Sequence, residues 1–119
     1  MARTRKSAKA AGARFERVVA DYLAEELADD RIDRAPKAGA KDKGDIANVR
    51  MGDHKIVIEC KDVARMDLPK WTHEAQVEAE NASALVGIVV HKRHGVAKPG
   101  QQWATMTLGD LTRLLKGNQ

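Results

Sequence analysis

The spacing of apolar residues between positions 12 and 29 predicts an amphipathic helix. Its apolar side chains recur every three or four residues and form one stripe. They are Phe15, Val18, Val19, Tyr22, Leu23 and Leu27. Glu16 falls inside this stripe, where a carboxylate costs free energy unless something pairs with it. Glu16 is therefore a candidate functional group; the alternative is a glutamate whose long side chain reaches solvent.

Strand patterns follow this helix. A short strand at 31–36 and a polar loop at 37–44 lead to two strands, 45–50 and 55–61, joined by a turn at 51–54. The nearly continuous apolar run 84–91 is typical of a buried central strand.

Two further helices are predicted in the second half of the chain. One begins at Asp67-Leu68-Pro69 and ends near residue 83. After a strand at 102–106, Thr107 and Asp110 have the spacing of a capping box and open a leucine-containing helix that ends at Gly117. The expected fold is a single α/β domain over residues 11–119, with helices packed on a central mixed sheet, preceded by a mobile basic arm, residues 1–10.

Composition limits the class of protein. The 119 residues suit one domain with one core, and 43% apolar with 32% charged residues is typical of a soluble globular protein. No apolar run approaches the roughly 20 residues of a membrane span, and the basic N-terminus leads into no apolar segment. The single cysteine, Cys60, excludes an internal disulfide. We therefore expect a protein of the cytoplasm, in a bacterium or a phage-infected host cell, with no membrane partner.

Basic residues gather in three stretches that surround the central strands, within a net charge of +4. The candidate DNA-binding residues among them are Arg5, Lys6, Lys9, Arg14, Lys37, Lys41, Lys43, Lys92 and Arg93. Such clusters can neutralise phosphates and give salt-sensitive nucleic-acid binding. The alternative is a solvated tail and two solvated loops.

The candidate chemistry lies on the strand 55–61. Side chains alternate along a strand, so Glu59 and Lys61 share one face about 7 Å apart, while Cys60 points into the core. A hairpin would bring Asp45 beside them. The two carboxylates, together with the backbone carbonyl of Cys60, would form an oxygen site suited to Mg²⁺. Lys61 could orient or help deprotonate an attacking water and stabilise developing negative charge.

The same residues have a simpler interpretation, because Glu59 and Lys61 could form an ion pair on an exposed strand face. An acid two residues before a lysine is common. Gly44-Asp45-Ile46 at the start of a strand, the β-branched run before Glu59, and Glu16 in an apolar stripe favour a nuclease site.

These motifs resemble the PD-(D/E)XK nuclease superfamily, and within it the archaeal-type Holliday junction resolvases and their phage relatives. The resemblance covers roughly residues 10–92 in order and spacing. The matching segments are Phe15-Glu16, Lys37-Ala38-Gly39-Ala40-Lys41, Gly44-Asp45-Ile46 and Ile56-Val57-Ile58-Glu59-Cys60-Lys61. The resemblance implies a restriction-endonuclease-like αβββαβ core with an extra C-terminal strand and helix. It also implies a homodimer that cuts branched DNA with Mg²⁺ or Mn²⁺.

Carried over to this chain, the resemblance makes Asp45 and Glu59 metal ligands, Lys61 the catalytic lysine and Glu16 the helix glutamate of the family. Gly44 stands where the motif's name has proline, and Asp42 is an alternative first acid that lies farther from the strand. Gln76 is similar to a glutamine of RecB-like exonucleases, but the tyrosine that follows it there is replaced by Glu80. Gln76 is therefore only an additional candidate.

Other polar and aromatic residues add little. The four histidines have no spacing typical of zinc, and His91 and His94 are interpreted as surface residues of a basic loop. Trp71 and Trp103 could stack on bases, form a dimer interface or belong to the core.

The sequence thus predicts a metal-dependent endonuclease that hydrolyses DNA, and the resemblance indicates a Holliday junction resolvase. Two alternatives stay open at this point. One is a nuclease of the same fold with another DNA substrate (nicking, restriction-like or single-strand exonuclease), and the other is a DNA-binding module that does not cut. A ribosomal or RNA-binding accessory role is a third, suggested only by the basic N-terminus.

Overall fold

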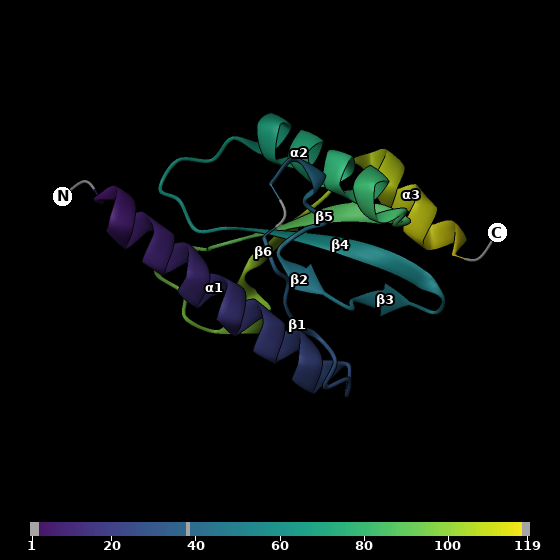
Figure 1. The fold of residues 1–119 in the computed structure, drawn as a ribbon, viewed down its shortest axis with the longest axis horizontal. Coiled ribbons are helices and arrows are strands. Elements are labelled where there is room, and N and C mark those ends of the chain that lie inside the picture. Colours follow the sequence, from purple (N-terminus) through teal and green to yellow (C-terminus); the bar gives the residue numbers. More distant parts are fainter. Residues whose placement is uncertain (1–2, 38, 118–119) are drawn as a thin grey trace.

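The computed structural model describes residues 3–37 and 39–117. It has a mixed sheet with helices on both faces (Figure 1). The helices are α1 (Arg5–Glu26), α2 (Leu68–Ala82) and α3 (Leu108–Lys116), with short 3-10 turns at Gly39–Lys41 and Pro99–Gln101. The strands are β1 (Asp33–Arg34), β2 (Ile46–Ala47), β3 (Arg50–Met51), β4 (His54–Lys61), β5 (Val86–His91) and β6 (Trp103–Thr105).

The sheet has the order β1-β2-β4-β5-β6, with β3 paired to β4 in continuation of β2. The β4–β5 pair is parallel, because α2 carries the chain back across the sheet, and the other pairs are antiparallel. This confirms the predicted mixed α/β architecture. The predicted strand 45–50 is instead two short strands, because Asn48 adopts φ 70° between them.

Each face of the sheet packs against a different helix. On one face, Phe15 and Val19 of α1 pack with Ile56 and Ile58 of β4 in the main core. On the other face, Trp71 and Ala75 of α2 pack on Val89. Figure 1 shows α1 on one side of the sheet and both α2 and α3 on the other. Strand β4 is therefore covered on both faces, and its polar side chains have to be accommodated beneath a helix.

Helix α1 begins earlier than the sequence predicts. Thr4 caps it by accepting a hydrogen bond at 3.0 Å from the backbone N–H of Ser7. Residues 5–10, which the sequence assigns to a basic arm, form exposed turns of α1, and residues 1 and 2 lie outside the described part. The alanines in this segment favour a helix even without packing.

The C-terminal half matches the predicted elements with two corrections. Asp67 caps α2, and Thr107 caps α3 by accepting a bond from the N–H of Asp110 at 3.2 Å. The capping box is incomplete, because the buried Asp110 carboxylate accepts from the N–H of Gly87 at 3.4 Å rather than reaching back to Thr107. His91, interpreted as a surface residue, is buried against Trp71 and pairs with Thr105 at 2.8 Å.

Helix α3 uses few of its leucines for packing. Leu114 packs against the main core, whereas Leu108, Leu111 and Leu115 are exposed. Within the described residues, no helix combines the length and apolar character that a membrane crossing requires.

Strand β5 lies very close to the backbone of α2 at Gly87. A Cβ atom on Gly87 of β5 would meet the carbonyl oxygen of Ala75 at 2.2 Å. Only glycine leaves room for this approach, and the approach brings the side chains of α2 down onto β4 and β5.

We expect Gly87→Ala to lower the free energy of unfolding by about 1–3 kcal/mol, because the added methyl group displaces α2 from the sheet. The matched control is Gly12→Ala in α1, where a Cβ meets nothing within 4 Å. That change should raise stability by about 0.5–1 kcal/mol through helix propensity. Urea unfolding of both variants measures the difference; equal effects would contradict the close approach.

Candidate active site

Strand β4 presents a polar row toward α2. Glu59 and Lys61 share one face of the strand, as the sequence predicts, together with Val57. Cys60 faces the opposite side and packs against the main core, which confirms its predicted direction. The Glu59 face is not an exposed strand surface, since Val57 and Glu59 are both buried. The simpler interpretation, a solvent-exposed ion pair between Glu59 and Lys61, is therefore wrong.

Helix α2 places a second row opposite the first. Lys61 Nζ donates to Glu74 Oε2 at 3.0 Å, and the carboxylates of Glu59 and Glu78 lie in contact. Four residues of a helix advance about 6 Å and two residues of a strand about 6.7 Å, so the two rows stay in register. This match pairs Glu74 with Lys61, and it pairs Glu78 with Glu59.

Asp45 reaches the same place from the loop before β2. Its backbone N–H donates to the Ile58 carbonyl at 2.8 Å, and its Oδ2 accepts from the N–H of Cys60 at 2.8 Å. The N–H and C=O of one strand residue leave by the same edge, so the Cys60 carbonyl also points to the Asp45 side. Asp42 instead accepts from the N–H of Gly44 at 3.1 Å, which leaves Asp45 as the acid beside Glu59.

Gly44 has a structural reason to be glycine. Its φ is +98°, and a Cβ there would lie 2.9 Å from Val57 Cγ1 and 3.0 Å from the Ile58 carbonyl oxygen. Proline cannot adopt this φ, because its ring holds φ near −65°. The departure from the motif's proline therefore follows from how closely this loop lies on β4.

Glu16 is buried at the same site, as its place in the apolar stripe of α1 predicts. Its Oε1 accepts from Arg34 Nε at 3.1 Å, and its Oε2 accepts from Lys37 Nζ at 3.0 Å. Lys37 also forms a salt bridge with Asp45. Lys37 thus links the α1 carboxylate to the Asp45 carboxylate, so this predicted DNA-binding lysine neutralises site acids.

The carboxylates of the site differ in their electrostatics. Burial, together with the neighbouring Asp45 and Glu78, raises the pKa of Glu59 far above that of a free glutamate. Burial also raises the pKa of Glu78. Burial acts in the same direction on Asp45, but its contacts with Glu59, Lys37 and the Cys60 N–H outweigh it and lower the pKa of Asp45. The Glu59–Glu78 contact therefore has an excess of negative charge that a proton or a cation has to offset.

Lys61 remains charged despite its partial burial. Burial alone would lower the pKa of Lys61, but the hydrogen bond to Glu74 and the charge of Glu59 outweigh it and raise this pKa. At neutral pH, Lys61 is thus a hydrogen-bond donor rather than a base.

The donor set fits a divalent metal ion. Glu78 Oε1 is buried without a hydrogen-bond partner, next to Glu59. Asp45 and Glu59, with the Cys60 carbonyl, offer the oxygen atoms that Mg²⁺ prefers, and Mn²⁺ accepts similar ligands. Among the described residues, no three acidic, histidine or cysteine side chains are already arranged around one point. Mg²⁺ does not require such an arrangement, since it usually binds one or two carboxylates and completes its shell with water and substrate phosphate.

The other predicted site residues lie around this cluster. The exposed members of the basic set are Arg5, Lys6, Lys9, Arg14, Lys37, Lys41 and Lys43. Ala38, within the matched loop, lies outside the described residues. Lys92 Nζ donates to the Val96 carbonyl at 2.8 Å, and Arg93 stacks 4.7 Å above the exposed Trp103 ring. Gln76 donates to Thr107 Oγ1 at 3.3 Å, so it contacts the cap of α3 and not the acidic cluster.

Glu74 and Glu78 are the site residues that the sequence analysis missed. Glu78 falls among Trp71, Ala75 and Ala79 at spacings of three and four, which is the buried stripe of α2. A carboxylate inside an apolar stripe is the same signal that singles out Glu16. Glu74 carries no such signal, since only the register of α2 over β4 brings it to Lys61.

The raised pKa values make a prediction about stability in the absence of metal. The folded protein holds a proton on Glu59 at pH values where the unfolded chain has lost it, because burial and the neighbouring Asp45 and Glu78 raise the pKa of Glu59. The free energy of unfolding should therefore fall as pH rises from 6 to 8, by at most about 1.4 kcal/mol per pH unit for this proton. Glu78→Gln should reduce this slope, as measured by urea unfolding in EDTA.

The comparison with wild type isolates the carboxylate pair, because other titrating groups such as His91 are common to both proteins. The matched control is Glu80→Gln, an exposed glutamate of the same helix. If the free energy of unfolding depends on pH in the same way in Glu78→Gln and in wild type, the contact with Glu78 does not raise the pKa of Glu59.

Comparison with protein-family models, curated proteins and solved structures finds no match for this chain.

Proposed function

We propose that this protein is a metal-dependent DNA endonuclease whose site is formed by Asp45, Glu59 and Lys61. The observation that carries the proposal is the buried contact of Glu59 with Asp45 and Glu78, directly beside a charged lysine. Buried carboxylates gathered without enough cations destabilise a fold, and such groups are commonly found where they act. In phosphodiester hydrolysis, these carboxylates would bind the metal ion that the reaction requires.

The roles of the side chains follow from their positions. Asp45 and Glu59 would hold Mg²⁺ or Mn²⁺, which supplies a polarised phosphate and a water of lowered pKa when bound. The Lys61 ammonium, held by Glu74, would donate a hydrogen bond to the attacking water or to the phosphate oxygen that gains charge. Glu78 would share the charge of Glu59, and Glu16 with Lys37 would position Asp45.

The basic residues of α1 are arranged to guide a DNA strand toward this cluster. Lys9 and Arg5 precede Glu16 by seven and eleven residues, which are close to two and three helical turns. They therefore lie in line with Glu16 along the helix, about 10 and 16 Å from it. Exposed cations in such a row can contact successive phosphates without reading sequence.

The finer proposal is a Holliday junction resolvase of the restriction-endonuclease-like fold. The order of α1, three strand segments, α2 and β5, followed by an extra strand and helix, is compatible with the αβββαβ core that the resemblance implies. Such an enzyme would act as a homodimer with two sites related by a two-fold axis. Leu108, Leu111 and Leu115, exposed on one side of α3, offer an apolar surface for such a contact.

The activity is tested with a labelled four-way junction and a linear duplex of the same arms. We expect paired, symmetric nicks in the junction with Mg²⁺ and none with EDTA. Glu59→Gln and Lys61→Met should each reduce the rate at least about 100-fold. Glu80→Gln and Lys70→Met, which alter exposed residues of α2, are the matched controls and should cut normally.

The outcomes of this assay separate the alternatives. Equal cutting of linear DNA would replace the resolvase by a nuclease of broader substrate range. Salt-sensitive binding with no cutting by Mg²⁺ or Mn²⁺ would contradict the nuclease and favour a DNA-binding module.

Metal binding is a separate expectation. Mg²⁺ at about 100 times its dissociation constant should raise the free energy of unfolding by about 2.7 kcal/mol. The gain should be larger at pH 8 than at pH 6, because the ion displaces protons from the carboxylates. Thermal melting with and without Mg²⁺ measures this gain. Asp45→Asn should abolish it and Glu80→Gln should preserve it; a gain unchanged in Asp45→Asn would place the ion elsewhere.

A further inference from the structure

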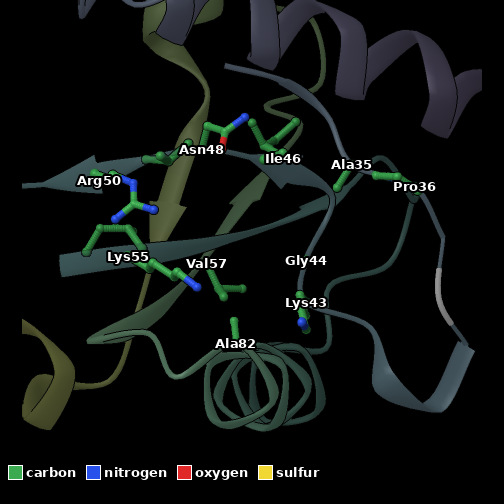
Figure 2. A pocket seen from close by; sticks show the side chains of 13 residues that line it. Ala35, Pro36, Lys43, Gly44, Ile46, Asn48, Arg50, Lys55, Val57 and Ala82 are labelled. Atoms are coloured by element: carbon green, nitrogen blue, oxygen red, sulfur yellow. The ribbon is translucent and has the colours of Figure 1, made fainter. Parts of the chain in front are cut away.

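A cavity of about 390 Å³ opens beside the acidic cluster, between the β2–β4 part of the sheet and the C-terminal end of α2 (Figure 2). Its walls are mainly apolar and include Ile46, Val57 and Ala82. This volume lies within the roughly 300–1,000 Å³ of small-ligand sites. The cavity could therefore hold one compact group with an apolar body.

Positive charge surrounds this apolar cavity. Lys43, Arg50 and Lys55 line it from three different segments, and Figure 2 shows Arg50 and Lys55 on one side and Lys43 across from them. No acidic side chain is among the described residues that line it. None of these three cations belongs to an ion pair within the described chain. An occupant with an apolar body and a negative charge fits this combination.

The cavity continues the two rows that build the candidate active site. Val57 precedes Glu59 on the same face of β4, about 7 Å away, and Ala82 follows Glu78 by one helical turn. Gly44, the neighbour of Asp45, lines the cavity as well. A nucleotide next to a phosphate held at Asp45 and Glu59 would therefore be within reach of the cavity.

We propose that this cavity binds one unpaired nucleotide of the DNA strand, adjacent to the phosphate that is cut. The base and sugar contact the apolar walls, and the phosphate lies near Lys43, Arg50 and Lys55. A base that is paired and stacked in a duplex cannot enter such a cavity, whereas a base at a single-stranded or distorted position can. The proposal rests on the proposed function for the direction of the strand, and it makes the cavity a determinant of substrate structure.

The test measures binding without cleavage. Fluorescence anisotropy in EDTA compares a labelled single strand with the duplex of the same sequence. Ala82→Leu fills the cavity with a side chain that a helix accepts well. We expect it to weaken binding of the single strand about tenfold and to leave duplex binding unchanged. Ala97→Leu, an exposed alanine in the loop before β6, is the matched control and should change neither.

A second pair of variants tests the charge. Lys55→Gln should weaken single-strand binding about threefold to tenfold at low salt, with a smaller effect at high salt. Lys70→Gln, an exposed lysine on α2, is its control. Urea unfolding of all four variants should give wild-type stability, which excludes unfolding as the cause of weaker binding.

A strand of abasic residues distinguishes the contribution of the base from that of the sugar-phosphate backbone. Its binding should be insensitive to Ala82→Leu, because no base enters the cavity. If the abasic strand loses as much affinity as the normal strand, or if inorganic phosphate competes as well as a nucleoside monophosphate, the cavity is a phosphate site and the proposal is overturned. Equal binding of the single strand by Ala82→Leu and wild type would also overturn it.

These outcomes are independent of catalysis. A protein that cuts DNA but binds single strands normally after Ala82→Leu would retain the nuclease and lose the nucleotide cavity. A protein that cuts nothing but loses single-strand affinity in Ala82→Leu would retain the cavity and lose the nuclease.

Discussion

The contact between α2 and the sheet at Gly87 and Ala75 governs the rest of the site. With a Cβ on Gly87, the helix could not lie where it does, since the Ala75 carbonyl oxygen would be 2.2 Å away. At this short separation the side chains of α2 cannot turn away from β4. As a consequence, the carboxylate of Glu78 contacts that of Glu59, and Glu74 accepts a hydrogen bond from Lys61. The fold thus places like charges together in a region that water reaches poorly.

The surrounding residues offset only part of this charge. On the α1 side, Glu16 and Asp45 share Lys37, and Arg34 adds a second cation to Glu16. Among the described residues, neither Glu59 nor Glu78 forms a salt bridge, and Glu78 Oε1 has no hydrogen-bond partner. In the proposed function, a divalent ion held by Asp45 and Glu59 would supply the positive charge that this side of the site lacks.

The helices and strands can be predicted from the sequence wherever a local pattern, such as an apolar spacing or a helix cap, determines the backbone conformation. The cap and proline at Asp67–Pro69 and the apolar run of β5 predict α2 and β5 closely, and the apolar spacing predicts α1 except for its turns before residue 12. The pattern fails at Asn48, whose left-handed φ divides a predicted strand. It also fails at His91, which is buried although its basic neighbours in the sequence led us to expect a surface residue. In both cases the deciding contact comes from a distant segment: Asn48 donates to the Arg31 carbonyl, and His91 packs on Trp71.

The sequence by itself determined which side chains share a face. Glu59 with Lys61, and Glu16 within an apolar stripe, follow from the periods of a strand and a helix. Only the tertiary structure decided which faces meet. The register of α2 over β4, set by the Gly87 contact, brings Glu74 and Glu78 to the site, and the same helix leaves Gln76 at the cap of α3. Periodicity fixes a direction around one element, whereas the distance between two elements depends on backbone packing that no local pattern encodes.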